Sequence, residues 1–539
     1  MSNFRPAEIR RAIRQELSAG PFDVLVIGGG IVGAGVARDA ALRGLRVALC
    51  EQDDFAFGTS SRTSRLLHGG LRYLAQGRLG LVYEASREKR ILHRIAPHLA
   101  QPLEFVFPTY RRSGWPRWQL AIGVTLYDLL CGGRNLGPSR VLSCEQVRQI
   151  LPGLRTEGLT GAVAYYDALT QDARLVVDTL RSAHRAGAVL ANYMKVLQAH
   201  RTADGWQAEV QDQQTGQTLE ISARVIVHAA GPWAEQFPQS SVRLRRTKGV
   251  HLVLDRRRVE IRPDPAALSY AVVGACCSPP ATNGGAPADA RQPGLLPSAD
   301  ACPAVVLAEG SRIVFLIPWG DRLILGTTDT DYTGPNEAVC TQPEDVRYLL
   351  AVANQYFPDA HLTEADILAD WAGIRPLIYT GRGGPSDISR AHWIRSPEPG
   401  WIDVAGGKLT TYRLMAEQVV DEVGRHLGRR LPPCRTAHLP LLESAEEARW
   451  SGILPPPVSA EAVQYFCQHE WTYHLDDLML QRTGWHYYLP DPARTAQEAA
   501  CWLAQQLGWT AQQQQAELAH YRETLPKPWA PSPGTTFEP

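Results

Sequence analysis

Three glycines near the N-terminus, set between two apolar runs, constrain this chain more than any other feature. Gly28, Gly30 and Gly33 follow the apolar run FDVLVI and precede a helix of small residues. A second apolar run then ends at Glu51. The first glycine allows a tight turn, the second lets the backbone approach a pyrophosphate, and the third lets the helix pack on its strand. Strand, glycine turn, helix, strand and acid together predict a dinucleotide-binding unit.

The acid at position 51 narrows the choice of dinucleotide. A carboxylate at the end of the second strand is suited to accept a hydrogen bond from a ribose hydroxyl, and it disfavours a 2′-phosphate. The sequence therefore favours FAD or NAD over NADP.

Composition excludes several other classes of protein. The 539 residues are too many for one core, so two or three domains are expected. With 55 basic and 55 acidic residues there is no net charge to attract nucleic acid, and none is expected as a partner. The ten cysteines show no CxxC pair and no spacing typical of a zinc site, which favours a reduced, cytosolic chain without a metal. The first twenty residues are charged and lack the apolar stretch of a signal peptide.

Hydrophobic periodicity divides the rest of the chain. Strand patterns at 187–197, 206–210 and 223–229 are expected to complete the nucleotide-binding sheet, and the strand-rich region 242–330 predicts an antiparallel sheet. Residues 274–303 are dense in Gly, Pro and Ala and predict a mobile surface loop. Helical patterns at 458–470 and 495–522 predict a separate C-terminal domain.

These patterns give the following domain ranges: 1–80 cofactor-binding (first part), 81–160 helical or substrate-cap insertion, 161–240 cofactor-binding (second part), 241–365 antiparallel substrate domain, 366–435 cofactor-binding (closing part), 436–525 C-terminal helical domain and 526–539 flexible tail.

Two further stretches carry residue types suited to a cofactor and a substrate. The segment TSSRTSRLLHGGLRYL at 59–74 combines hydroxyls, arginines, a histidine and two glycines, although a Ser-rich loop capping a helix is the plainer reading. Downstream lie GTTD at 326–329, Arg375, and a strand that runs into a Gly-Gly turn at 405–411. The helix after that turn could face a second polar part of the same cofactor, whereas Arg375 and Lys408 could also be ordinary surface cations.

Together these segments resemble the FAD-dependent glycerol-3-phosphate dehydrogenases, which are flavin oxidoreductases related to D-amino-acid oxidase. The resemblance covers roughly residues 20–510 and rests on the glycine fingerprint, TSSRTSRLLHGGLRYL, AAGPW, KGVHLVL, GTTDTDY, GIRPL, GGKLTTYR and HLDDLMLQRT. Two departures are visible: His228 stands where the family usually has Asn, and the 274–303 loop is longer than expected.

The resemblance implies an α/β protein with a Rossmann-like FAD-binding domain, an antiparallel-sheet substrate domain and a C-terminal helical domain. It also implies oxidation of sn-glycerol 3-phosphate to dihydroxyacetone phosphate, with FAD reduced and then reoxidised by a membrane quinone. The implied FAD-binding residues are Gly28, Gly30, Gly33, Glu51, Thr59, Ser60, Ser61, Ser64, His68, Gly69, Gly70, Val196, Ala230, Gly231, Thr328, Asp329, Gly406, Gly407, Lys408, Leu409 and Thr410.

The catalytic residues implied by the same resemblance are His251, Arg375, Lys408, Arg72 and Tyr73. Arg375 is the first expected phosphate ligand and Arg72 the second, because a guanidinium can bind phosphate oxygens bidentately. Lys408 suits the flavin edge or a developing alkoxide. Two histidines, His251 and His68, can titrate near neutral pH and are candidates for the base. His251 is favoured and lies on the predicted substrate sheet, whereas the resemblance places His68 against FAD.

A quinone lies in the bilayer, so the chain must reach a membrane. Residues 110–131 combine arginines and tryptophans with an apolar stripe, which predicts peripheral contact with the inner face of the cell membrane from the cytoplasm; a helix packed inside the protein fits the pattern equally well. The alternatives are an oxidase that uses oxygen, an amine or amino-acid oxidase, an NAD-dependent dehydrogenase and a non-catalytic flavin-binding subunit. The oligomeric state stays open, a homodimer included.

Overall fold

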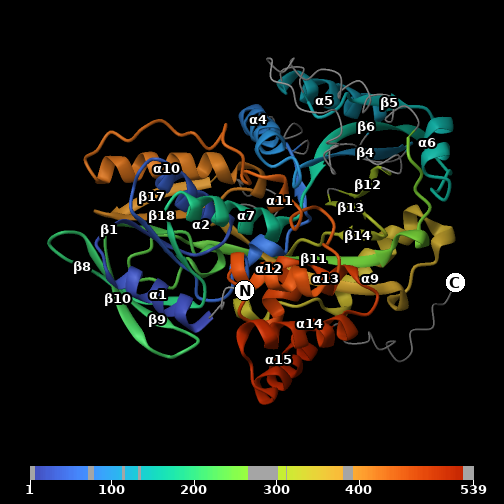
Figure 1. The fold of residues 1–539 in the computed structure, drawn as a ribbon. Coiled ribbons are helices and arrows are strands. Elements are labelled where there is room, and N and C mark those ends of the chain that lie inside the picture. Colours follow the sequence, from blue (N-terminus) through green and yellow to red (C-terminus); the bar gives the residue numbers. More distant parts are fainter. Residues whose placement is uncertain are drawn as a thin grey trace, which may run out of the picture.

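Two sheets organise the chain. The computed structural model describes residues 6–70, 78–111, 116–131, 135–264, 302–310, 312–379 and 392–525. The predicted tail at 526–539, and nearly all of the 274–303 loop, lie outside the described residues. In Figure 1 the first sheet lies on the left and the second on the right, with the C-terminal helices below.

The first sheet has the order β17-β18-β10-β1-β2-β7, and β8 and β9 extend it beside β10. Its strands are β1 (Phe22–Ile27), β2 (Val47–Cys50), β7 (Val189–Ala191), β8 (Met194–Arg201), β9 (Trp206–Asp212), β10 (Thr218–His228), β17 (His392–Glu398) and β18 (Trp401–Gly406). The central neighbours β18, β10, β1, β2 and β7 are parallel. The interior strand β2 is VALC and is buried throughout, as expected for a parallel strand covered on both faces.

Small residues let a helix approach this sheet closely. Helix α2 (Ile31–Leu42) reads IVGAGVARDAAL and is almost entirely buried between the sheet and the helices α7 (Asp172–Arg185) and α10 (Tyr412–His426). Its N-terminus follows β1 directly, so the amides of its first turn lie at the carboxyl ends of the parallel strands. That edge is where ligands bind in open α/β sheets.

The second sheet is largely antiparallel and runs in the order β15-β11-β14-β13-β12-β4-β6-β3, with β16 beside β11 and β5 beside β6. Its strands are β3 (Leu66–Leu67), β4 (Gln101–Tyr110), β5 (Arg140–Leu142), β6 (Leu159–Leu169), β11 (Leu244–Asp255), β12 (Ala304–Glu309), β13 (Arg312–Trp319), β14 (Arg322–Gly326), β15 (Thr330–Asp331) and β16 (Ile367–Ile378). The long β11–β16 pairing places His251 opposite Trp371 and Gly249 opposite Gly373.

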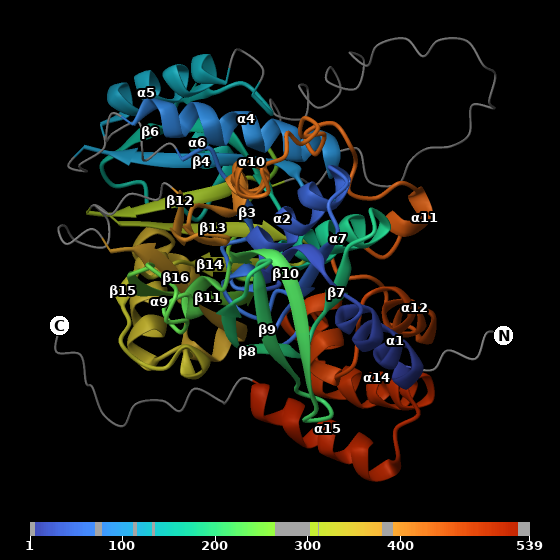
Figure 2. The ribbon, with the colours of Figure 1, turned by 90° about the vertical axis from the view of Figure 1, so that its left-hand side faces the viewer.

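The remaining helices cover these sheets. They are α1 (Pro6–Ser18), α4 (Leu79–Ile95), α5 (Arg117–Leu130), α6 (Cys144–Ile150), α9 (Pro343–Tyr356), α11 (Ala445–Ala448), α12 (Ala460–His469), α13 (Trp485–Tyr488), α14 (Pro492–Leu507) and α15 (Ala511–Thr524). Figure 2 shows α4 and α5 side by side at one end of the molecule, with α14 and α15 at the opposite end. Within the described ranges, no helix is long and apolar enough to cross a bilayer.

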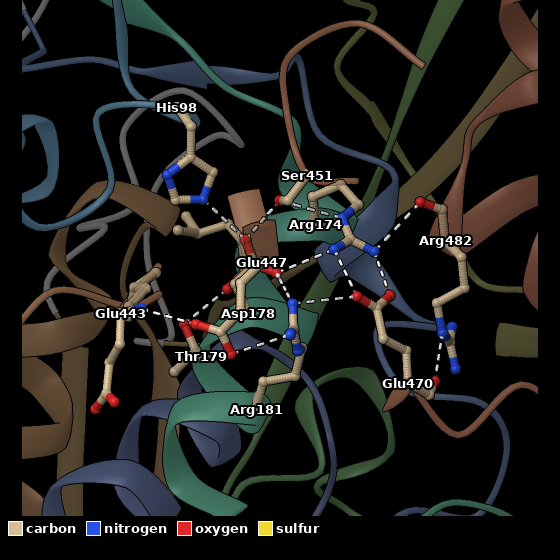
Figure 3. A network of polar contacts seen from close by, with 12 residues as sticks. His98, Arg174, Asp178, Thr179, Arg181, Glu443, Glu447, Ser451, Glu470 and Arg482 are labelled. Atoms are coloured by element: carbon tan, nitrogen blue, oxygen red, sulfur yellow. Dashed lines mark hydrogen bonds and ion pairs between the residues drawn. The ribbon is translucent and has the colours of Figure 1, made fainter. Parts of the chain in front are cut away.

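A buried ion-pair network joins the C-terminal helices to the first sheet's helices (Figure 3). Arg174 and Arg181 on α7 both pair with Glu470, which follows α12, and Arg174 also pairs with Asp178 at 3.0 Å. The guanidinium of Arg482 makes two contacts with Asp54, at 2.6 and 2.7 Å. Removing one partner of such a buried pair leaves an uncompensated charge, so the network ties the C-terminal domain to the region around Asp54.

The predicted α/β architecture with an antiparallel second sheet and a helical C-terminal region is confirmed. Three strands of the second sheet lie in ranges expected to bind the cofactor: β3 in the range 1–80, most of β6 in the range 161–240, and β16 in the range 366–435. Hydrophobic periodicity identifies a strand but not its partner, because pairing joins segments far apart in sequence. The helical pattern at 495–522 is two helices, separated at Gly508, whose φ of +72° ends α14.

Candidate active site

One large cavity lies between the two sheets, and most of the predicted site residues line it. Those that do are Gly28, Gly30, Glu51, Thr59, Ser60, Ser64, His68, Val196, Ala230, Gly231, His251, Arg375, Gly406, Gly407, Lys408, Leu409 and Thr410. The first sheet contributes its carboxyl edge, and the second sheet contributes β11 and β16. One cavity thus joins the predicted cofactor segments to the predicted substrate residues.

The glycine turn has the shape needed to hold a pyrophosphate. Gly28 has a φ of +109°, and a Cβ there would lie 2.6 Å from the carbonyl oxygen of Ala229. At Gly30, which precedes α2, no side chain caps the helix, and the amide of Ile31 donates to the hydroxyl of Ser60 at 3.0 Å. A helix N-terminus without its own carboxylate cap leaves its dipole available to an anionic ligand.

Glu51 closes the cradle as an acceptor. Its carboxyl oxygens accept hydrogen bonds from the amide of Gly29 at 2.6 Å and from the amide of Asp53 at 3.0 Å. Burial raises the pKa of this carboxyl to about 7, against the lowering effect of those two amides. Both oxygens still have lone pairs for ribose hydroxyls, so the donor and acceptor pattern fits an adenine dinucleotide.

The two distant segments assigned to the cofactor meet in the structure. The amide of His68 donates to the hydroxyl of Thr410 at 3.1 Å, and that hydroxyl donates to the carbonyl of His68 at 3.2 Å. The strand β18 ends at Gly406, and a short 3-10 turn at Leu409–Thr411 precedes α10. The loop after the nucleotide unit and the Gly-Gly turn therefore form one wall, as an extended dinucleotide requires.

His251 lies on the second sheet's side of the cavity. Its ring is buried, stacks on Trp371 with centroids 5.1 Å apart and planes at 19°, and has Nε2 at 2.8 Å from the hydroxyl of Ser64. Nδ1 has no hydrogen-bond partner among the described residues. Burial, and after it the cations Arg375 and Arg65, hold the pKa of His251 well below its ordinary value. The imidazole is therefore neutral and can accept a proton.

Arg375 lies on β16, the strand next to His251. Its guanidinium contacts Asp329 at 3.3 Å and donates to the hydroxyl of Thr327 at 2.9 Å. A Cβ on Gly249, across the strand pair, would lie 2.3 Å from the guanidinium, so the absent side chain makes room for it. The cation is held in a fixed position at the cavity wall.

Some predicted cofactor residues support the wall without lining the cavity: Gly33, Ser61, Gly69, Gly70, Thr328 and Asp329. A Cβ on Gly33 would lie 1.9 Å from the carbonyl oxygen of Gly28, which explains the packing role expected of this glycine. The amide of Gly69 donates to Tyr127 and Asp167, and the hydroxyl of Thr328 accepts from the amide of Val250. Arg72 and Tyr73 lie outside the described residues.

Sequence reasoning missed several lining residues, among them Gln52, Phe57, Arg62, Thr63, Lys195, Trp233, Gly249 and Gly373. The glycine pair carried a usable signal, since a glycine inside a strand pattern often marks a close approach of backbone or ligand. A Cβ on Gly373 would lie 2.8 Å from the carbonyl oxygen of Arg62. Arg62, Thr63 and Trp233 lie in segments that the sequence had singled out, 59–74 and AAGPW, although no role was assigned to them individually. Lys195, on β8, carries no local signal.

Comparison with known proteins agrees with this geometry. The sequence model described as "FAD dependent oxidoreductase" matches residues 23–278 and 288–413. The chain is therefore an FAD dependent oxidoreductase, and the cradle at Gly28, Glu51 and Thr410 fits that cofactor.

Individual relatives narrow the class of FAD-dependent oxidoreductase. An aerobic glycerol-3-phosphate dehydrogenase from Staphylococcus haemolyticus is 34% identical over 445 residues, which cover 80% of this chain and 73% of the relative. The chain belongs to the family of the aerobic glycerol-3-phosphate dehydrogenases.

Solved structures show the same fold. The glycerol-3-phosphate dehydrogenase from Bacillus halodurans, complexed with FAD, has a TM-score of 0.71 and 28% identity, and the match covers 97% of each chain. The L-alpha-glycerophosphate oxidase from Mycoplasma pneumoniae, with FAD bound, has a TM-score of 0.55 at 16% identity over 78% of this chain and 99% of that one. The second likeness concerns the fold alone.

Proposed function

We propose that this protein oxidises sn-glycerol 3-phosphate to dihydroxyacetone phosphate and passes the electrons to a membrane quinone. One observation carries the proposal: a neutral, buried His251 and a fixed Arg375 lie on adjacent strands of the cavity whose other end is the FAD cradle. FAD, when bound, supplies the acceptor for the hydride of the alcohol carbon.

His251 is the proposed base for the hydroxyl proton of the substrate. The alcohol carbon gives up its hydrogen with the bonding electron pair, the oxygen gives up its proton, and the carbon–oxygen bond becomes a double bond. The hydrogen bond between Nε2 and Ser64 orients the ring, and the low pKa keeps it unprotonated before the substrate arrives. His68, which also lines the cavity, is the second candidate.

Arg375 is the proposed ligand of the substrate phosphate. Asp329 and Thr327 hold its guanidinium in place, so little rotamer freedom is lost when it binds an anion. Lys408, at the Gly-Gly turn in the cavity lining, is proposed to stabilise negative charge at the cofactor edge or on the substrate oxygen. Arg72 stays a further proposed phosphate ligand.

The direct test is to purify the protein, record its visible spectrum and add sn-glycerol 3-phosphate without oxygen. We expect a yellow protein whose flavin absorbance bleaches. A colourless protein would contradict the cofactor, and a yellow protein that glycerol 3-phosphate does not bleach would overturn the substrate.

A matched pair of variants tests the base. H251N should bind FAD but slow anaerobic bleaching by about 100-fold or more, the range of a general base. H361N is the control, because His361 is exposed and has a φ of 44°, which Asn tolerates. Bleaching of H251N at the wild-type rate would exclude His251 as the base.

The proposed electron acceptor and the proposed location at the membrane are inferred from the exposed face of helix α5. Trp118, Ile122 and Leu129 have exposed fractions of 63%, 61% and 71%, and their spacing places them on one face of the helix. Leu79 and Tyr83 on the adjoining helix α4 are also exposed. These observations support peripheral binding to the cytoplasmic face of the cell membrane, where a quinone is available.

Vesicle sedimentation tests this contact. The triple variant W118S/I122S/L129S should be released from vesicles and should reduce quinone more slowly, while sn-glycerol 3-phosphate still bleaches its flavin. L197S, which removes an exposed leucine on β8, is the control. Wild-type protein that stays in the supernatant with vesicles present would refute the contact, and peroxide formed in proportion to substrate would favour oxygen as the acceptor.

A further inference from the structure

Arg65 is a buried cation beside the site that the proposed reaction does not use. It follows the 3-10 turn Thr59–Ser61 and precedes β3. Its φ is +55°, its amide donates to the hydroxyl of Thr63 at 2.9 Å, and its carbonyl accepts from the amide of Thr170 at 2.8 Å. This left-handed backbone turns the side chain into the interior, where only 2% of it is exposed.

Three aromatic rings surround the guanidinium. Its Cζ lies 4.1 Å from the ring centroid of Trp319, 4.8 Å from that of Trp371 and 5.5 Å from that of Tyr487. These rings come from β13, β16 and α13, so three separate elements form the box. Cation–π contacts of this kind are strongest when the cation is desolvated, as it is here.

The box does not satisfy the polar atoms of the cation. Nε and Nη1 have no hydrogen-bond partner among the described residues. The carboxylate that opposes its charge is Asp172, whose oxygens already accept from Thr63 and from the amide of Ala173. A buried cation with unsatisfied donors is costly, so its charge calls for a role beyond packing.

Arg65 and His251 share two neighbours. Ser64, the residue before Arg65, contacts Nε2 of His251 at 2.8 Å, and the ring of Trp371 packs against both the imidazole and the guanidinium. The indole of Trp371 donates to the carbonyl of Thr63 at 3.1 Å, which fixes the ring to the same segment.

The other elements packed on His251 add one charge pair. Arg375, on β16, is the second cation that acts on the ring, and Asp329 pairs with it. On β14 the nearest residue is Gly326, which has no side chain, because a Cβ there would lie 2.3 Å from the ring.

We propose that Arg65 is a positioning residue for His251. Its guanidinium, surrounded by the three rings, holds Trp371 and Ser64 against the imidazole, and its fixed charge opposes protonation of that imidazole. This inference rests on the proposed function, since it assigns a partner to the proposed base. An unprotonated ring is the form that accepts the substrate proton, so a nearby cation keeps the base ready at mildly acid pH.

The sign of the effect follows from the charges. Among the causes that lower the pKa of His251, burial is the largest, and the cations Arg375 and Arg65 add to it. Removal of the Arg65 charge takes away a repulsion that acts only on the protonated ring. The pKa of His251 then rises, and the pH below which the base is blocked moves upward.

The first experiment observes the histidine directly. Protein labelled at histidine Cε1 is titrated from pH 8 down to the lowest pH at which it stays folded, because the pKa of His251 lies well below its ordinary value. The His251 signal is identified by its absence in H251N. In R65M the titration midpoint should lie about one pH unit above that of wild type, the usual effect of a nearby charge. R65K, which keeps the charge, should resemble wild type, and R46M is the control, because Arg46 packs over Phe22 away from the cavity.

The second experiment follows anaerobic flavin bleaching by sn-glycerol 3-phosphate as a function of pH. In R65M the acid limb of the rate should move to higher pH by the same amount, while R65K restores the wild-type profile. R65Q takes the place of R65M in both experiments if the methionine variant does not fold. A histidine titration and a rate profile in R65M that both superimpose on wild type, or an R65K shift as large as that of R65M, would overturn the inference.

The two proposals fail separately. If glycerol 3-phosphate bleaches no flavin in the wild type, the proposed function is wrong, and the histidine titration still decides whether Arg65 acts on His251.

Discussion

The affinity for FAD should depend strongly on pH, because the ionisation of Glu51 is coupled to FAD binding. The pKa of this carboxyl is raised from 4.5 to about 7 by burial, so it is about half protonated at neutral pH in the protein without cofactor. Ribose hydroxyls donate to a carboxylate better than to a protonated carboxyl. FAD affinity should therefore rise with pH and level off above about 7.

The size of the effect follows from the shift. At pH 5, two units below that pKa, only about 1% of the carboxyl is ionised, which corresponds to about 2.7 kcal/mol. Provided that bound FAD lowers the pKa below 5, the dissociation constant should fall by up to about 100-fold between pH 5 and pH 8. Folding of the protein without FAD shows the opposite trend. Since the folded-state pKa lies above the unfolded one, this group's contribution to stability is lost as pH rises from about 4.5 to about 7.

The assay is titration of the protein without cofactor with FAD, followed by flavin fluorescence at several pH values. E51Q should remove this pH dependence. It should also weaken binding at pH 8, because one of the amides of Gly29 and Asp53 then faces an NH₂ group, a loss of about 1–3 kcal/mol. E220Q, at an exposed carboxylate on β10, is the control. If wild type and E51Q lose affinity in parallel as pH falls, Glu51 is not the group responsible and the reasoning fails.

Three further predictions concern packing, docking and substrate binding. G33A should abolish FAD binding, because its Cβ would overlap the carbonyl oxygen of Gly28, whereas G80A has open space and should bind FAD normally in a spectral assay. R482M should lower stability by about 3–5 kcal/mol by leaving Asp54 unpaired in the interior, and adding D54N should recover part of the lost melting temperature; an unchanged melting temperature would refute a role for this pair. R375M should weaken binding of dihydroxyacetone phosphate by about 10-fold or more without loss of FAD, as measured by perturbation of the flavin spectrum, and unchanged affinity would exclude Arg375 as the phosphate ligand.

Much of the cofactor site could be predicted because its signals are local. The turn at Gly28 needs a left-handed backbone, which favours glycine, and the helix after it needs small residues. Glu51 stands at the end of the strand that follows this helix. Each requirement constrains residues close together in the chain. The strand at 223–229 and the strand that runs into the Gly-Gly turn at 405–411 could be predicted on equally local grounds, since strands buried in a parallel sheet are continuous apolar runs.

The residues on the second sheet's side of the cavity were less predictable from the sequence. Gly249 and Gly373 face each other only because β11 and β16 pair in one register, and no periodicity reports which strand pairs with which. Nothing in the sequence distinguishes Arg65 from the other arginines of the hydroxyl-rich segment at 59–74. Its burial among aromatic rings from three distant elements appears only in the folded chain.

Residue patterns alone predict the dinucleotide cradle, the α/β class and the family, because glycine conformation, hydrophobic periodicity and motif identity are properties of short segments. The folded chain is needed to see that β6 and β16 join the second sheet, that His251 is a neutral ring held by Ser64 and Trp371, and that Arg65 is its buried neighbour. Protonation state and electrostatic environment depend on burial and on charges brought together from far apart in the chain, and no local pattern of residues encodes them.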